Sequence, residues 1–180
     1  MNRIIKSSAR EPITDVSAGS SRLGDLYERS GPGAVRLAFL LTGDQAIAED
    51  IAQDAFVRVV GHLGHLRDPG AFDAYLRRTV VNLAKNHFRR RAVERRFLAR
   101  ATAPEPVPGP ERTMVDRRIV VDALARLPQR QRAAIVLRYY EDLPEDAIAS
   151  ILRCRPATVR SVVARGVQTL RFELREAIHA

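Results

Sequence analysis

The sequence has few of the residues that brace small secreted folds or cross membranes. Its 180 residues include one cysteine, Cys154, and no tryptophan, and only 6% are aromatic. A single cysteine excludes an internal disulfide and is typical of a reducing compartment. The longest apolar run lies within AVRLAFLL at 34–41 and is far shorter than the roughly 20 residues of a membrane-spanning helix. The N-terminus lacks the apolar core of a signal peptide. We therefore expect a cytoplasmic protein with no direct membrane insertion.

Acidic residues are scarce relative to basic ones. The chain has 21 Asp and Glu against 30 Lys and Arg, which gives a net charge of +9 at pH 7 and a pI near 10.8. A balance this basic favours a polyanionic partner, either nucleic acid or an anionic membrane surface, and composition alone does not separate the two. Hydrophobic residues, at 46%, are nevertheless abundant enough to build packed cores.

Strands, internal repeats and Gly-rich phosphate loops are not evident in the sequence. Apolar residues instead keep helical spacing in two long stretches. Between them, ATAPEPVPGPER at 101–112 has a proline at every second position from Pro104 to Pro110, which favours an extended, semi-stiff linker. The sequence therefore predicts an all-α fold of two small helical domains joined by a Pro-rich linker. The predicted boundaries are a disordered tail at 1–20, a helical bundle at 21–100, the linker at 101–113 and a second helical domain at 114–180.

The second domain contains a predicted helix-turn-helix at 144–168. Pro144 suits the first turn of a short apolar helix, and Pro156 ends the turn and presets the backbone of the next helix. Two short helices joined by a tight turn place the second helix in the DNA major groove. Arranged at about 100° per residue, that helix has an apolar arc of roughly 140°. The arc consists of Val159, Val162, Val163, Val167 and Leu170, and the opposite side carries Arg160, Ser161, Ala164, Arg165 and Gln168.

The outward side chains of that second helix have the chemistry of a DNA reader. Arg160 and Arg165 can each present a planar fork of donors to guanine or phosphate. Thr158 and Ser161 can contact bases or the backbone. An amphipathic helix pair with a solvated basic face is the alternative. Cys154, in the turn, is interpreted as a small apolar filler.

An acidic helix is predicted in the first domain, at DQAIAEDIAQDAFVRVV, residues 44–60. An exposed apolar residue, Val57, lies among carboxylates, which is typical of a protein-contact surface and would repel DNA. An ordinary solvated helix face is the alternative. The predicted buried side consists of Ile51, Ala52, Ala55, Phe56 and Val59, and the outer side carries Glu49, Asp50, Gln53, Asp54 and Val57.

A strongly basic helix follows the acidic one, with Asp68 and Pro69 predicted at its start. Nine Lys or Arg residues lie between Leu76 and Arg100. Basic residues can follow a phosphate backbone, and interleaved aromatic and Asn side chains can hold unstacked bases. Phe72 and Phe88 fit a packed core equally well.

The sequence contains no group of residues that forms a recognisable catalytic pattern. There is no nucleophile triad and no pair of carboxylates at a plausible spacing. His62 and His65, spaced as HxxH, have no carboxylate or thiol partner nearby in the sequence, so no metal site is predicted. We therefore predict neither enzyme activity nor a cofactor.

Taken together, these stretches resemble a sigma factor of the extracytoplasmic-function (ECF, group IV) family, the promoter-specificity subunits of bacterial RNA polymerase. LTGDQAIAEDIAQDAFVRVV is similar to the polymerase-binding helix of sigma domain two, and AYLRRTVVNLAKNHFRRR resembles its promoter-melting helix. LPQRQRAAIVLRYYEDLPEDAIASILRCRPATVRSVVARGVQTLR resembles sigma domain four. The resemblance extends from about Leu23 to Leu170 and is closest in style to actinobacterial members.

This resemblance implies that the chain binds core RNA polymerase, through the coiled coil of the largest subunit and the flap, and recognises promoter DNA. It leaves open an anti-sigma factor as a further partner. The loop from Gly61 to Phe72 would capture a flipped base. The implied contacts are Glu49, Asp50, Gln53, Asp54 and Val57 for core polymerase, Arg78, Asn82, Lys85, Asn86 and Arg89 for −10 DNA, and Thr158, Arg160, Ser161 and Arg165 for −35 DNA.

A stand-alone helix-turn-helix repressor or activator is the alternative function. It explains the second domain, but it does not explain an acidic contact helix beside a basic, aromatic one in the first domain.

Overall fold

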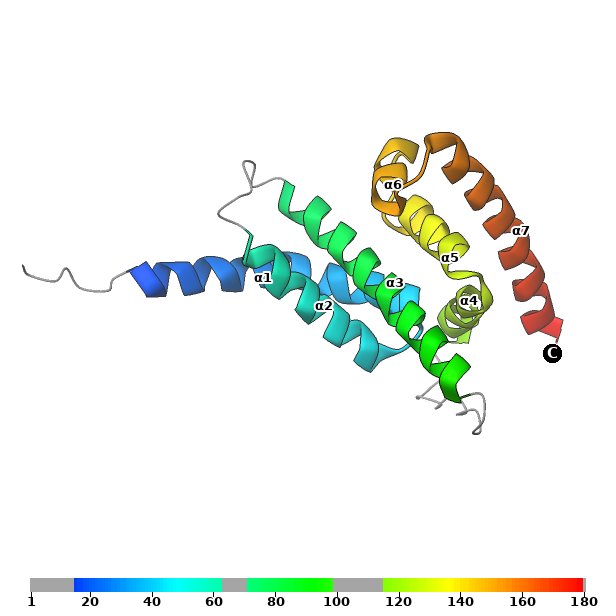
Figure 1. Ribbon diagram of the computed structural model, residues 1–180, viewed down its shortest axis with the longest axis horizontal. Coiled ribbons are helices and arrows are strands. Elements are labelled where there is room, and N and C mark those ends of the chain that lie inside the picture. The colour runs from blue at the N-terminus through cyan, green and yellow to red at the C-terminus, as the bar shows by residue number, and fades with distance from the viewer. Residues whose placement is uncertain (1–14, 63–70, 99–114, 180) are drawn as a thin grey trace, which may run out of the picture.

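The computed structural model describes residues 15–62, 71–98 and 115–179, and every regular element within those ranges is a helix (Figure 1). The all-α prediction is confirmed for this part of the chain. The predicted tail up to residue 14, Asp68 and Pro69, and the predicted linker at 101–113 lie outside the described residues. None of the described helices is long and apolar enough to cross a membrane.

The first domain is a bundle of three helices, α1 (Asp15–Thr42), α2 (Gln45–Val60) and α3 (Phe72–Leu98). Ala38, Ala48 and Ala55 are fully buried between them, and such small contact residues let helix axes approach closely. α1 begins inside the stretch predicted to be a tail, so that prediction is wrong for residues 15–20. Extending a helix that packing has already nucleated costs little, because each added residue gains a hydrogen bond.

The second domain is built on a long final helix that packs against the shorter ones before it (Figure 1). Val159 and Val162 on the inner side of that helix are buried, as predicted. The elements are α4 (Val115–Arg126), α5 (Gln129–Ile135), a π-helical turn η3 (Val136–Tyr140), α6 (Glu145–Leu152) and α7 (Pro156–His179).

The predicted helix-turn-helix is present, formed by α6 and α7. Arg153 ends α6 in the left-handed conformation, with φ 51°, and Cys154 N–H donates to the Ala149 carbonyl at 3.0 Å. This termination redirects the chain toward α7. Pro156 is the first residue of α7, as predicted, where its missing N–H costs no hydrogen bond. Pro144 is the N-cap of α6, with an extended backbone, rather than a residue of the first turn.

Arg132 of α5 joins the two domains, and only 4% of it is exposed. Its Nη1 donates to the Leu41 carbonyl of α1 at 2.7 Å, and its Nη2 donates to the carbonyls of Ala125 and Leu127. The guanidinium carbon lies 5.5 Å from the centroid of the Phe88 ring of α3. Burial lowers the pKa of Arg132 to about 10, so the side chain stays charged at neutral pH. The two domains therefore pack directly against each other.

Candidate protein and nucleic-acid interfaces

The predicted protein-contact face of α2 is exposed. The Asp44 side chain accepts a hydrogen bond from the Ile47 N–H at 3.0 Å, which caps the start of the helix. The inner side of α2 is buried as predicted, except that Phe56 is half-buried and packs edge-on against Tyr27 and Phe72. The outer side is exposed as predicted, at Glu49, Asp50, Gln53, Asp54 and Val57.

Polar pairs order the side chains on this outer face of α2. Asp54 accepts two hydrogen bonds from Arg58, from Nε at 2.7 Å and from Nη2 at 2.8 Å. Glu49 accepts one from Gln45 Nε2 at 2.6 Å. Both pairs join residues four apart on the helix, where side chains are neighbours. The face remains rich in carboxylates, so it repels phosphate and fits a protein partner.

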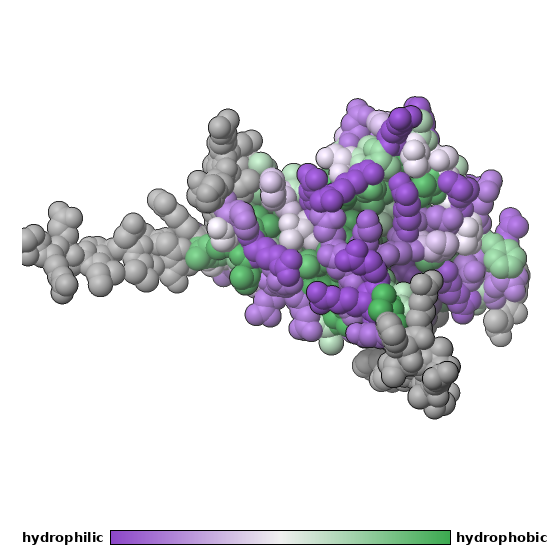
Figure 2. All heavy atoms as spheres, in the orientation of Figure 1, coloured by the Kyte–Doolittle hydropathy of each residue, from purple (hydrophilic) through white to green (hydrophobic). Residues whose placement is uncertain are grey.

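The residues predicted to contact −10 DNA share one face of α3. At helical spacing they fall within an arc of about 100°. The opposite side of α3 is the buried one, with Leu76, Val80 and Ala84 in the core. Mostly hydrophilic side chains cover the middle of the molecule over α3 (Figure 2). Lys85 and Arg89 are exposed, whereas Arg78, Asn82 and Asn86 are half-buried.

The aromatic side chains of α3 have different surroundings. Phe72 is 1% exposed and meets the Phe56 ring edge-on at 5.7 Å, so it belongs to the core. Phe72 is therefore not available to hold an unstacked base; residues 63–70 of the loop predicted to capture a flipped base lie outside the described part. Phe88 is half-buried beneath Arg132. Tyr75 is 50% exposed and available for stacking.

His87, also on α3, does not add charge to the basic face at neutral pH. Its Nε2 is buried and has no hydrogen-bond partner. Burial lowers the pKa of the imidazole, and the nearby Arg91 guanidinium lowers it further. The ring is therefore neutral at pH 7.

The outer face of α7 carries the predicted −35 residues. Arg160, Ser161 and Arg165 are exposed, and Thr158 is half-buried. The Ser161 hydroxyl donates to the Thr158 carbonyl at 2.9 Å, and Arg165 Nε donates to the Ser161 carbonyl at 3.2 Å. Because the buried valines of α7 face α5 and α6, these polar side chains lie on the solvent side of the helix-turn-helix.

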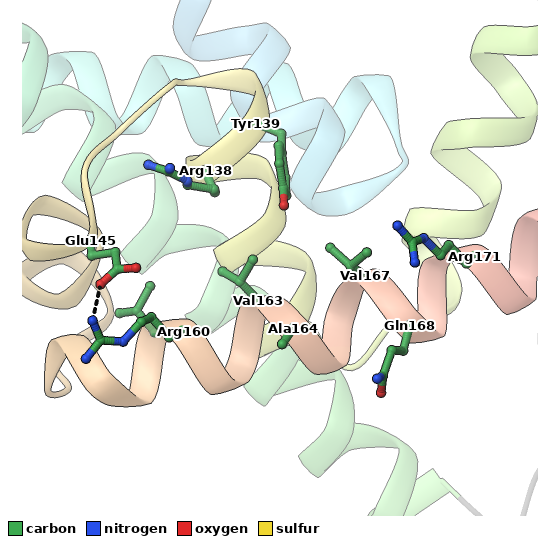
Figure 3. Close-up of a pocket in the computed structure, with 10 residues that line it drawn as sticks. Arg138, Tyr139, Glu145, Arg160, Val163, Ala164, Val167, Gln168 and Arg171 are labelled. Carbon is green, nitrogen blue, oxygen red and sulfur yellow. Dashed lines mark ion pairs between the residues drawn. The ribbon is translucent and has the colours of Figure 1, made fainter.

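A groove of about 390 Å³ lies between η3 and α7 (Figure 3). Tyr139 projects from η3 toward Val163 and Val167 of α7, with Arg138 beside it. Arg171 lies further along α7 in the same groove. Arg138 and Tyr139 are not among the contact residues predicted from the sequence, whereas Arg171 is predicted as a phosphate contact near the rim of α7. The paired tyrosines in LRYYEDL are the signal that could have indicated the first two, since aromatic residues are rare in this chain.

Comparison with known proteins finds both sigma regions in this chain. Residues 26–94 match the family model of Sigma-70 region 2, and residues 117–170 match that of Sigma-70, region 4. The chain is 35% identical over 153 residues to the ECF RNA polymerase sigma factor SigE of Mycolicibacterium smegmatis, covering 82% of this chain and 59% of that protein. It is 32% identical over 150 residues to the RNA polymerase sigma-E factor of Streptomyces coelicolor, covering 82% of this chain and 84% of that protein.

The fold is also shared with a solved sigma factor. RpoE of Bartonella quintana, in its complex with the anti-sigma factor NepR, aligns with a TM-score of 0.73 over 86% of this chain and 98% of that chain, at 21% identity. A region 2 followed by a region 4 on two packed helical domains defines the sigma-70 class of transcription factors. Within that class, the chain belongs to the ECF sigma factors, which direct promoter-specific initiation by RNA polymerase and are not themselves enzymes. A stand-alone repressor does not account for the region 2 match.

Proposed function

We propose that three helical faces divide the work of this sigma factor. The acidic face of α2 binds the coiled coil of the polymerase's largest subunit, α3 contacts −10 DNA, and the outer face of α7 reads the −35 element. The observation that carries the proposal is the change of charge between neighbouring helices of one domain. α2 exposes carboxylates, whereas α3 exposes arginine and lysine.

This difference in charge indicates which helix contacts DNA and which contacts polymerase. Phosphate-binding surfaces need positive charge, and DNA affinity grows with each phosphate that is neutralised. A carboxylate face is disfavoured beside DNA and is complementary to a basic protein surface. The acidic residues Glu49, Asp50 and Asp54 therefore belong to the polymerase contact.

The basic faces carry side chains that suit base recognition. An Asn side chain can pair with an adenine edge or with an unstacked base, which supports −10 contacts by Asn82 and Asn86. Lys85 and Arg89 lie beside them and can bind phosphates. On α7, the fork of Arg160 fits guanine O6 and N7. The remaining contacts proposed for these two elements are Arg78 on α3 and Thr158, Ser161 and Arg165 on α7.

The division of the chain into domains follows from the same assignment. We place sigma domain two at 21–100 and sigma domain four at 114–180, supported by the family matches at 26–94 and 117–170. The stretch at 101–113 is the linker, directed toward the RNA exit path, and the flap holds the second domain.

Because polymerase works in the cytoplasm, the chain acts there. The B. quintana relative in complex with an anti-sigma factor supports such a partner for this chain.

Charge reversal on α2 tests the polymerase contact. Asp50→Lys combined with Asp54→Lys should weaken binding to core polymerase by roughly 30-fold or more, because reversing charges at a contact surface costs several kcal/mol. Affinity is measured by titrating core enzyme with labelled protein. Asp25→Lys combined with Glu28→Lys reverses two exposed acids on α1 and serves as the matched control.

The control should bind as the wild type does, since neither residue lies on α2. Helical content, measured by circular dichroism, should be unchanged in both variants, because all four positions are exposed. Equal affinity of the α2 variant and the control would show that the acidic face is not the polymerase contact.

A further inference from the structure

Glu145 reaches the proposed reading helix from the helix before it. It is the first residue of α6, and its Oε2 lies 3.4 Å from Nη1 of Arg160 on α7 (Figure 3). The two side chains are 38% and 67% exposed. One nitrogen of the Arg160 guanidinium is therefore paired with Glu145, while the outer part of the guanidinium is accessible to solvent.

We propose that Glu145 is a positioning residue that sets the base preference of Arg160, an inference that rests on the proposed −35 reading by α7. A guanidinium carries five donors in a rigid fork, so one ion pair leaves enough donors for the two acceptors of guanine. Restricting a long, exposed side chain before binding removes part of its ordering cost. A carboxylate beside DNA also repels every phosphate, which lowers the affinity for all sequences. The correct base contact then determines which sequence is bound.

Glu145→Gln should consequently lower the base preference of the protein without lowering its affinity for DNA. Binding to promoters with a non-preferred base should stay equal or strengthen, because a negative charge is removed. The preference ratio at the base read by Arg160 should fall about two- to fivefold, the range expected from an exposed ion pair. Asp146→Asn is the matched control, since it removes the same charge from the next residue of α6, which is exposed.

The experiment measures holoenzyme binding to a set of single-base −35 variants for Glu145→Gln, Asp146→Asn, Arg160→Ala and the double variant Glu145→Gln with Arg160→Ala. The preference effect of Glu145→Gln should vanish in the Arg160→Ala background, because the two residues act on one contact. If Arg160→Ala changes no preference, the proposed reading by α7 is wrong. If Arg160→Ala changes it and Glu145→Gln matches Asp146→Asn, only the positioning role is wrong.

An independent observation concerns the boundary between the two domains. Arg77 of α3 pairs with Glu141 of the second domain, with Nε and Oε2 2.5 Å apart and the side chains 25% and 14% exposed. Glu141 follows η3, where the wider π turn closes with a hydrogen bond from the Glu141 N–H to the Val136 carbonyl at 3.1 Å. Arg132 adds its buried bond to the Leu41 carbonyl in the last turn of α1, a position where carbonyls lack helical partners.

A chain packed in this way cannot reach both promoter elements. Centres at −10 and −35 are about 25 base pairs apart, or about 85 Å along the duplex at roughly 3.4 Å per base pair. A compact chain of this length has a radius of gyration of about 16 Å. The second domain must therefore separate from the first before both elements are bound.

We propose that Arg77, Glu141 and Arg132 form the latch that holds the two domains in this packed, closed state, and that the strength of the latch sets how much of the chain is available to polymerase. A protein whose binding-competent state is only partly populated binds its partner more weakly in proportion to that population. Loosening the latch should therefore strengthen polymerase binding. A substitution that damages a contact surface has the opposite effect, so the two are readily distinguished.

A charge swap on the full chain tests the latch. Arg77→Glu and Glu141→Arg each place like charges opposite one another, so each should increase the radius of gyration measured by small-angle X-ray scattering and strengthen core polymerase binding at least threefold. The double variant restores opposite charges and should return both values to those of the wild type. Glu141→Gln, which removes the pair without adding a like charge, should act in the same direction as the reversals.

Two results would contradict the latch. An unchanged radius of gyration in both single variants and in Glu141→Gln would show that the pair does not hold the domains together. A larger radius with unchanged polymerase affinity would show that the closed state is not inhibitory. Circular dichroism confirms that each variant keeps its helices.

Discussion

Gly166 allows α7 to lie directly on α5. A Cβ added at this position would sit 2.8 Å from Ile135 Cδ1 and 3.2 Å from Gln131 Cβ. Ile135 is buried, with 5% exposure, so it has little room to move aside. The absence of a side chain at Gly166 therefore lets α7 and α5 approach closely.

Gly166→Ala should therefore destabilise the protein even though alanine favours helix. Overpacking costs about 1–3 kcal/mol, more than the roughly 1 kcal/mol that alanine gains over glycine in a helix, so we expect a net loss of about 1 kcal/mol. Gly33→Ala in α1 is the control, because a Cβ there meets no atom within 4 Å, and it should stabilise. Urea unfolding of both variants measures the difference. Stabilisation by both would mean that α7 is not held this tightly against α5.

At the scale of single elements, helical periodicity predicts the buried faces of α2 and α7. An amphipathic helix has one apolar side whatever it packs against, so the spacing of Ala55 and Val59 or of Val159 and Val162 is sufficient. The predicted contact residues on the outer sides are placed by the same argument. For this reason the exposure of Asp50 and Arg160 could be predicted from the sequence.

Irregular backbone within the elements could not be predicted. Each hydrogen bond of the π turn η3 spans one residue more than in an α-helix, and nothing in VLRYY distinguishes the two. Arg153 and Asp142 adopt positive φ without being glycine, which tertiary packing decides rather than local propensity. The groove residues Arg138 and Tyr139 depend on η3 for their positions, so they could not be predicted as groove residues from the sequence.

At the scale of the whole molecule, the contact between the two domains also could not be predicted from the sequence. Periodicity indicates that a face is buried but not which surface covers it. Arg132 in LPQRQRAAIV looks like a solvated charge, since arginine is rarely buried without partners. Only the structure brings its guanidinium to the carbonyl end of α1 and over Phe88.

The central claim is that base preference resides in α3 and α7 while α2 holds the polymerase. The most direct test is transcription by core polymerase from a library of randomised promoters, with the wild-type chain and with variants of each reading helix. Wild type should enrich two separated elements that core enzyme alone does not. Asn82→Ala with Asn86→Ala should flatten preferences in the −10 element only, and Arg160→Ala should flatten them in the −35 element only. Variants that alter both elements together, or neither, would contradict the claim.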